Sequence, residues 1–214
     1  MFILTNHNSI ANHFLAELRD RKIQKNAARF RHNLQKVGEI LAYEISKTLN
    51  YQPQQVDTPL GKASTHLIPE PPVLATILRA GLPFYQGFLH YFEAAESAFV
   101  GAYRGPQSAD HQFEIIQGYA VSPDLTDKDL ILIDPMLASG KSIIKAYEDL
   151  SQRGRPHSIH IAAVIASKQG VDHVQRQLPQ ANIWLGDLDQ ELNDKAYIVP
   201  GLGDAGDLAF GPKD

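Results

Sequence analysis

The chain has 214 residues and a mass of 23.7 kDa, which suits one globular domain spanning residues 1–214. Hydrophobic residues make up 43% of it, and its longest apolar run, Ile161 to Ala166, is far shorter than the roughly 20 residues of a membrane span. It has no cysteine, a net charge of −4 and no secretory-signal pattern, which argues against disulfides, thiolate metal sites and a general nucleic-acid coat. These features predict a cytoplasmic protein.

The first third of the chain has helical patterning. Apolar residues between Ala27 and Leu49 recur at spacings of three and four, which places them on one face of a helix. Residues 50–72 follow, and their many prolines predict an arm or hairpin that lies outside the core.

After residue 72, short β-rich runs alternate with candidate helices. The runs are Val73–Leu78, Ala98–Tyr103, Leu130–Ile133, Ile159–Ile165 and Ile183–Leu185. The candidate helices are Pro83–Phe92, Ser142–Arg153 and Gly170–Leu178. This alternation predicts an α/β fold, a doubly wound, mostly parallel sheet with a helical N-terminal section and a small arm. Ligands bind such sheets at the carboxyl ends of the strands.

Residues 130–142 read LILIDPMLASGKS, an apolar strand followed by an acid, a turn of small residues and a helix start. Small residues allow backbone N–H groups to converge, and the first turn of a helix adds further unpaired N–H groups. The pattern predicts a phosphate cradle over residues 136–142. A Walker A loop is disfavoured because Pro135 stands where that motif needs glycine.

Residues 197–207 read YIVPGLGDAGD, and Gly201, Gly203 and Gly206 satisfy the G-x-G-x-x-G pattern. A dinucleotide site is excluded because only eight residues follow Gly206, too few for the helix and second strand that it needs. The block is then either a compact ligand loop with exposed amides or a simple cluster of C-terminal turns.

Two arginines, Arg79 and Arg104, stand at the ends of predicted strands. Each alone is typical of a surface ion pair, but guanidinium groups also bind phosphoryl oxygens in a bidentate manner. Together with the cradle, they indicate a ligand with two separate phosphate groups. Asp134 lies between them and can accept hydrogen bonds from sugar hydroxyls. 5-Phosphoribosyl diphosphate has this shape.

The sequence resembles the uracil phosphoribosyltransferases, a branch of the type I phosphoribosyltransferase fold, from about residue 10 to the end. The resemblance rests on the blocks ILRAG at 77–81, YR at 103–104, DPMLASG at 134–140, and YIVPGLGDAGD at 197–207 with Phe210 and Gly211. The chain departs from the family pattern at Pro83, Ser139 and Lys141, where the family usually has glycine, threonine and a small residue.

The resemblance implies a role for each block. Arg79 and Arg104 would hold the diphosphate, and Asp134 would face the ribose. The catalytic residues would be Asp134 and Asp204, with Asp204 between the base and the donor. Uracil would be read by Ile198, Gly203 and Ala205, mainly through backbone groups, in a base-recognition loop over 197–211. The remaining donor-binding residues would be Pro135, Met136, Leu137, Ala138, Ser139, Gly140, Lys141 and Ser142.

The reaction implied is transfer of the phosphoribosyl group to uracil N1, giving UMP and diphosphate in pyrimidine salvage. Mg²⁺ would be held mainly by substrate and water, so no dedicated metal ligands are expected. GTP is a candidate allosteric activator, as in some relatives.

We expect a homodimer or higher homo-oligomer, with the 50–72 arm as a contact. Residues 105–112 are either a mobile loop that closes over the site or an ordinary hairpin loop.

Two alternatives stay open. A catalytically altered paralogue could act as a nucleotide-sensing or RNA-binding regulator, since residues 19–31 hold six basic side chains against one acid, Asp20. This run is also typical of a solvated helix face or a subunit contact. A transferase for a purine base is the second alternative, and the 197–207 block argues against it.

Overall fold

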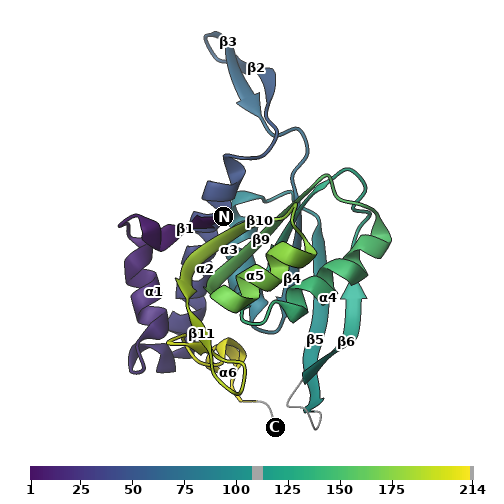
Figure 1. The fold of residues 1–214 in the computed structure, drawn as a ribbon. Coiled ribbons are helices and arrows are strands. Elements are labelled where there is room, and N and C mark those ends of the chain that lie inside the picture. The colour runs from purple at the N-terminus through teal and green to yellow at the C-terminus, as the bar shows by residue number, and fades with distance from the viewer. Residues whose placement is uncertain (108–112, 213–214) are drawn as a thin grey trace.

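The computed structural model describes residues 1–107 and 113–212, apart from the side chains of residues 102–118. Its centre is an eight-stranded sheet in the order β1-β10-β9-β7-β4-β5-β6, with β8 paired to β9 (Figure 1). Every pairing is parallel except that of β5 with β6. The prediction of a mostly parallel α/β sheet is therefore confirmed.

The sheet strands are short at its β1 edge and long at the opposite edge. They are β1 (Phe2–Ile3), β4 (Val73–Leu78), β5 (Ser97–Gln107), β6 (Phe113–Val121), β7 (Asp129–Ile133), β8 (Met136–Leu137), β9 (Ser158–Ser167) and β10 (Asn182–Asp189). Two smaller pairs lie outside the sheet: β2 (Gln52–Thr58) with β3 (Gly61–Leu67), and β11 (Glu191–Leu192) with β12 (Ile198–Val199).

The helices pack on both faces of the sheet. The α-helices are α1 (Ala11–Arg19), α2 (Ala27–Ser46), α3 (Gly81–Tyr91), α4 (Lys141–Leu150), α5 (Lys168–Gln177) and α6 (Ala205–Phe210), and the 3-10 turns are Leu4–Asn6, Ile23–Lys25 and Ser151–Arg153. One buried cluster joins the sheet to α1, α2 and α3, and a second joins it to α4 and α5. The strands are apolar along their length because both faces are covered.

The predicted elements match the structure closely, with one correction. β4 has the predicted bounds, and α2 begins at the predicted Ala27. The assignment of residues 105–112 to a loop is wrong for Gly105 to Gln107, because β5 continues to Gln107 and pairs with β6. Residues 108–112 of that predicted loop lie outside the described residues.

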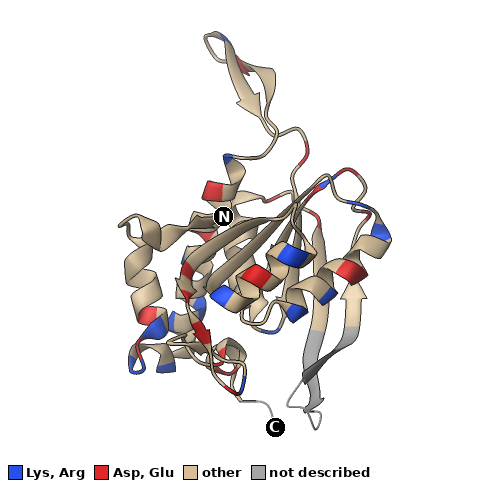
Figure 2. Ribbon diagram, in the orientation of Figure 1, with Lys and Arg blue, Asp and Glu red and all other residues tan. Residues whose placement is uncertain are grey.

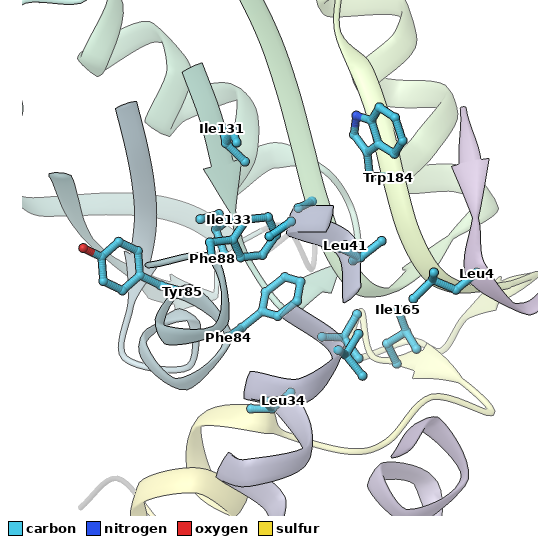
Figure 3. Packing of buried hydrophobic residues seen from close by; sticks show 14 of the residues in the cluster. Leu4, Leu34, Leu41, Phe84, Tyr85, Phe88, Ile131, Ile133, Ile165 and Trp184 are labelled. Atoms are coloured by element: carbon cyan, nitrogen blue, oxygen red, sulfur yellow. The ribbon is translucent and has the colours of Figure 1, made fainter. Parts of the chain in front are cut away.

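The α2–α3 contact forms much of the first cluster, and Figure 3 shows Phe84 and Phe88 of α3 packing beside Leu34 and Leu41 of α2. The two helices approach closely where glycines face each other. A Cβ atom on Gly87 would lie 2.2 Å from the carbonyl oxygen of Gln35. Only glycine allows this separation, and it places the helical N-terminal section firmly against the sheet layer.

The β2–β3 hairpin projects from the body of the protein (Figure 1). Every residue of both strands is exposed, and Leu60 in the turn between them is 100% exposed. The hairpin covers residues 52–67 of the predicted 50–72 arm, while Ile68 packs against the core and Pro72 is buried.

A buried polar chain crosses the amino ends of three strands. Trp184 Nε1 donates to His160 Nδ1 at 3.1 Å, and the Ser158 hydroxyl lies 3.2 Å from His160 Nε2 and donates to Asp129. Since indole N–H only donates, Nδ1 accepts, and the ring is neutral with its proton on Nε2. Burial lowers the pKa of His160 below 6.5.

We expect this histidine to make stability depend on pH. Its folded-state pKa is depressed, so the unfolded chain takes up a proton first and the free energy of unfolding falls as pH drops below about 6.5. Unfolding followed by fluorescence of Trp184, the single tryptophan, should show a shallower pH dependence in His160→Gln than in the wild type. His7 is exposed, and His7→Gln is the control. If the free energy of unfolding has the same pH dependence in all three proteins, the prediction is contradicted.

Candidate active site

Three of the predicted site residues lie in or directly after neighbouring strands of the sheet. β4 lies between β7 and β5, and the three strands are parallel, so their carboxyl ends share one edge. Arg79 follows β4, Asp134 follows β7, and Arg104 lies in β5, beyond the residues that pair with β4. The side chain of Arg104 lies outside the described residues.

A buried threonine connects the two central strand ends. The Thr76 hydroxyl in β4 donates to the carbonyl oxygen of Ile133 at 3.1 Å, and Thr76 is 0% exposed. A Cβ atom on Gly81 would lie 2.2 Å from this hydroxyl oxygen, so the chain can turn into α3 at this point only with glycine. The sequence analysis missed Thr76; its signal is one hydroxyl within an otherwise apolar strand.

The predicted phosphate cradle is a turn between β7 and α4. Met136 and Leu137 pair with β9 as β8, and Gly140 takes a left-handed conformation with φ of 77° before α4 begins at Lys141. Gly140 stands at the N-cap position of α4 and supplies no side-chain cap. The first-turn N–H groups of a helix have no partner within the helix, so this end can bind an anion. Lys141 is exposed and Ser139 is half-buried.

The cradle is held in place from behind by β9 and α5. The Ser167 hydroxyl donates to the Ala138 carbonyl oxygen at 2.6 Å and accepts from the Gly170 N–H at 2.9 Å. A Cβ atom on Gly170 would lie 2.1 Å from the same carbonyl oxygen. Ser167 is 0% exposed. The sequence analysis missed both residues, although a serine immediately before a helix is a recognised start signal.

Asp134 has little support for its negative charge in the free protein. Its carboxylate accepts one long hydrogen bond, 3.4 Å from the Met136 N–H. Burial is the main cause that raises the pKa of Asp134 to about 7, and the Met136 hydrogen bond opposes it weakly. A carboxyl group with a pKa near neutral pH, beside the turn that begins at Met136, suits recognition of hydroxyl donors.

The C-terminal block is a compact loop that leads into α6. Gly201 and Gly203 have positive φ values of 58° and 95°, and Ile198 and Ala205 are 4% and 3% exposed. Asp204 caps α6, since its Oδ1 accepts from the N–H groups of Gly206 at 2.9 Å and Asp207 at 3.1 Å. Within the described part of the chain, its Oδ2 atom accepts no hydrogen bond.

Arg79 connects the strand-end site with the C-terminal block. Its Nη2 atom lies 3.6 Å from Asp207 Oδ1 and donates to the carbonyl oxygen of Gly211 at 3.3 Å. The peptide bond between Leu78 and Arg79 is cis, and the Arg79 side chain is exposed. Two blocks that are far apart in the sequence therefore meet at one site.

The carboxylate oxygens at this edge of the sheet would suit a Mg²⁺ ion that is held mainly by substrate and water. Among the side chains that the structure describes, no three histidines or acids gather into a metal-binding group. The acids that do lie at the edge, Asp134, Asp204 and Asp207, are separate carboxylates rather than a cage. Magnesium accepts such an arrangement because it keeps several waters and binds substrate phosphates directly.

This fold, with an amide cradle after one strand and an arginine after its neighbour, is that of the phosphoribosyltransferases. A purine phosphoribosyltransferase from Pyrococcus horikoshii superposes with a TM-score of 0.50 at 14% identity, covering 70% of this chain and 81% of that chain. The AQ2163 protein from Aquifex aeolicus superposes over 98% of both chains, with a TM-score of 0.86 and 28% identity.

The family model for uracil phosphoribosyltransferase matches residues 4–212, and the chain belongs to that family. A uracil phosphoribosyltransferase from Porphyromonas gingivalis is 50% identical over 207 residues, 96% of this chain and 95% of that protein. Another from Staphylococcus epidermidis is 37% identical, over 95% of each chain. Among the helices within the described residues, none is long and apolar enough to cross a membrane.

Proposed function

We propose that the protein transfers the phosphoribosyl group of 5-phosphoribosyl diphosphate to N1 of uracil, giving UMP and diphosphate for pyrimidine salvage. Family membership supports the reaction. The structural observation that carries it is the contact of Arg79 with Asp207 and Gly211, which joins a phosphate-binding edge to the C-terminal block.

The donor would lie along the strand ends. Amides of residues 136–142 would bind its 5-phosphate, with the donor-binding stretch beginning at Pro135, and Asp134 would accept hydrogen bonds from the ribose hydroxyls. Arg79 and Arg104 would bind the diphosphate, where their charges oppose the negative charge that builds up as the leaving group departs. Arg79 would exchange its contact with Asp207 for the diphosphate.

Uracil would bind at the loop over residues 197–211, read by backbone groups of Ile198, Gly203 and Ala205. A fixed peptide loop suits a base that presents alternating donors and acceptors. Cytosine has an amino group where uracil has a carbonyl, so it would leave buried polar groups unpaired. Asp204 would orient N1 through its Oδ2 atom, since Oδ1 is used by the cap of α6.

In the reaction the bond between C1 of the ribose and the diphosphate oxygen breaks, and the bond from uracil N1 to C1 forms. The ribose carries positive character between these events, and the N1 proton passes to solvent. A Mg²⁺ ion held mainly by the diphosphate and water would supply positive charge that offsets part of the charge on the leaving group. The chain itself supplies binding, orientation and a site in which the reactants meet.

A product assay tests the proposal. Purified protein with uracil, 5-phosphoribosyl diphosphate and Mg²⁺ should form UMP, separated from uracil by chromatography. Guanine added in excess should leave this reaction unchanged. Absence of UMP from a protein that still binds the donor would overturn the proposal, and inhibition by guanine would point to a purine base.

The regulator alternative loses its main support in the structure. Of the basic residues between 19 and 31, Arg19 pairs with Asp187 and Asp189, Arg29 pairs with Glu17, and Arg31 donates to the Ala209 carbonyl. Three of the six basic side chains are therefore engaged within the protein, while Arg21, Lys22 and Lys25 stay exposed. No observation favours this alternative.

The exposed hairpin supports a homo-oligomer. An isolated two-stranded hairpin is only marginally stable in water, so we propose that β2 and β3 pack against a second copy of the chain. Replacing residues 52–67 with a short glycine linker is expected to halve the particle mass measured by sedimentation equilibrium. Leu60→Ser at the tip is the milder variant, with partial dissociation as its expected result. An unchanged mass after deletion would place the contact elsewhere.

A further inference from the structure

The basic segment of residues 19–31 has a structural role that its charge does not suggest. Figure 2 shows basic residues at the end of α1 beside acidic residues on β10, and these belong to one ion-pair network. Two arginines of the segment reach the C-terminal block. Arg19 donates to the carbonyl oxygen of Gly201 at 3.0 Å, and Arg31 donates to that of Ala209 at 2.6 Å.

Arg19 is held in one orientation by two carboxylates. Its Nη1 and Nη2 atoms donate to the two oxygens of Asp189 at 2.8 and 2.9 Å, a bidentate pair, and Nη2 also donates to Asp187 at 2.8 Å. Planar guanidinium forks fix geometry as well as charge. Nη1 therefore points at Gly201 with little freedom to turn away.

Asp189 completes a clamp on the same peptide unit. Its Oδ2 atom accepts from the Gly201 N–H at 3.0 Å, so both backbone polar groups of Gly201 are bound by this pair. Gly201 has φ of 58°, and a Cβ atom there would lie 2.1 Å from the carbonyl oxygen of Ile198. The clamp thus holds the turn between Ile198 and Gly203.

The burial of the pair argues for positioning rather than for simple stabilisation. Asp189 is 7% exposed, and the Arg19 side chain is 21% exposed. The free-energy cost of removing two charges from water offsets most of the free energy that their attraction contributes. Buried ion pairs therefore contribute little to stability. Their value lies in direction, and here Arg19 Nη1 and Asp189 Oδ2 each contact both the Gly201 peptide and one another.

We infer that Arg19 and Asp189 are positioning residues of the base site: they clamp the Gly201 peptide and so place the backbone groups that read uracil. The inference rests on the proposed function, in which Ile198, Gly203 and Ala205 contact the base. Arg31 supports the far end of the same loop through Ala209. Within the described residues, the side-chain hydrogen bonds of Arg19 and Asp189 go to Asp187, Gly201 and each other rather than to the proposed donor-binding residues.

The chain offers a matched pair of variants for the test. Asp189→Asn places an amide donor against Arg19 and weakens the clamp. Asp187→Asn removes an ion pair with the same arginine, but Asp187 does not contact Gly201. We expect KM for uracil to rise about tenfold or more in Asp189→Asn, as for loss of a charged hydrogen bond, with KM for the donor within about twofold. Asp187→Asn keeps the bidentate Asp189 pair and both Gly201 contacts, so it should raise KM for uracil much less than Asp189→Asn does.

Two further readouts make the outcome decisive. Arg19→Lys keeps the charge but loses the planar fork that pairs with both Asp189 oxygens while it donates to Gly201, so it should also raise KM for uracil selectively. Hydrogen exchange at the Gly201 amide should quicken in Asp189→Asn and not in Asp187→Asn. Equal rises in both KM values, or equal effects of the two aspartate variants, would overturn the inference.

The exchange measurement separates this inference from the proposed function. If the wild type makes no UMP, the proposed function fails and kinetics cannot report on the loop. Faster exchange at Gly201 in Asp189→Asn alone would then still support the clamp. Equal exchange in the wild type and both variants would overturn it whatever the activity.

Discussion

Asp134→Asn is expected to make the free protein more stable above pH 7 while it removes most of the activity. Burial raises the pKa of Asp134 to about 7, so the folded protein at pH 8 carries an ionised carboxylate that its surroundings disfavour. Asparagine has nearly the same shape and no charge to bury. It also lacks the second acceptor oxygen that the ribose hydroxyls would use.

The sign of the pH effect follows from proton binding. Between pH 4 and pH 7 the folded state holds a proton on Asp134 that the unfolded chain has already lost, so the free energy of unfolding falls as pH rises through this range. The difference between 3.8 and about 7 corresponds to at most about 4 kcal/mol above pH 7. The advantage of Asp134→Asn should therefore grow from pH 5 to pH 7 and then level off.

Urea unfolding at a series of pH values checks the stability effect, and donor kinetics check the activity. We expect kcat/KM for the donor to fall about tenfold to hundredfold at pH 8. In the wild type, donor affinity should rise with pH through about 7 as Asp134 ionises. Asp194→Asn, at an exposed turn, is the control. A variant that is less stable at every pH and retains full turnover would refute both roles.

The parallel strands were predictable because their burial on both faces requires apolar residues throughout. β4 appears at its predicted bounds for this reason, and α2 begins at the predicted Ala27 because its apolar residues recur at helical spacing. β1 was not predicted, since Phe2 and Ile3 form only two residues of strand and are half-buried. The end of β5 was missed because the run Gly105, Pro106 and Gln107 has a composition typical of turns. Pairing with β6 nonetheless extends the strand to Gln107.

The strand-end rule also located Arg79, Asp134 and the cradle, because parallel strands carry their ends to one edge. It could not find Ser167, Gly170, Arg19 or Asp189. Each of these acts on a backbone atom of a loop that is distant in the sequence, such as the Ala138 carbonyl or the Gly201 peptide. Every residue other than proline has the same backbone polar groups, whatever its type. The pattern of side chains in a sequence therefore does not reveal which loop a buried polar side chain supports.

Gly170→Ala is expected to weaken donor binding more than uracil binding and to destabilise the fold. In an exposed helix, alanine is favoured over glycine by about 1 kcal/mol. Here the added Cβ atom would lie 2.1 Å from the Ala138 carbonyl oxygen and 2.8 Å from that of Leu137, both backbone atoms of the cradle. Either α5 or the cradle must move, at a cost of about 1–3 kcal/mol, as for overpacked cores.

The matched control is Gln169→Ala, one residue earlier in α5 and exposed, which changes helix propensity without touching the cradle. We expect KM for the donor to rise at least about tenfold in Gly170→Ala and to stay unchanged in Gln169→Ala. Ser167→Ala removes the hydroxyl that holds the Ala138 carbonyl, so it should shift KM for the donor in the same direction without any clash. Donor binding that is normal in both Gly170→Ala and Ser167→Ala would mean that the cradle holds its shape without α5. A rise in both would instead show that the 5-phosphate site is built by β9 and α5 as much as by the residues that line it.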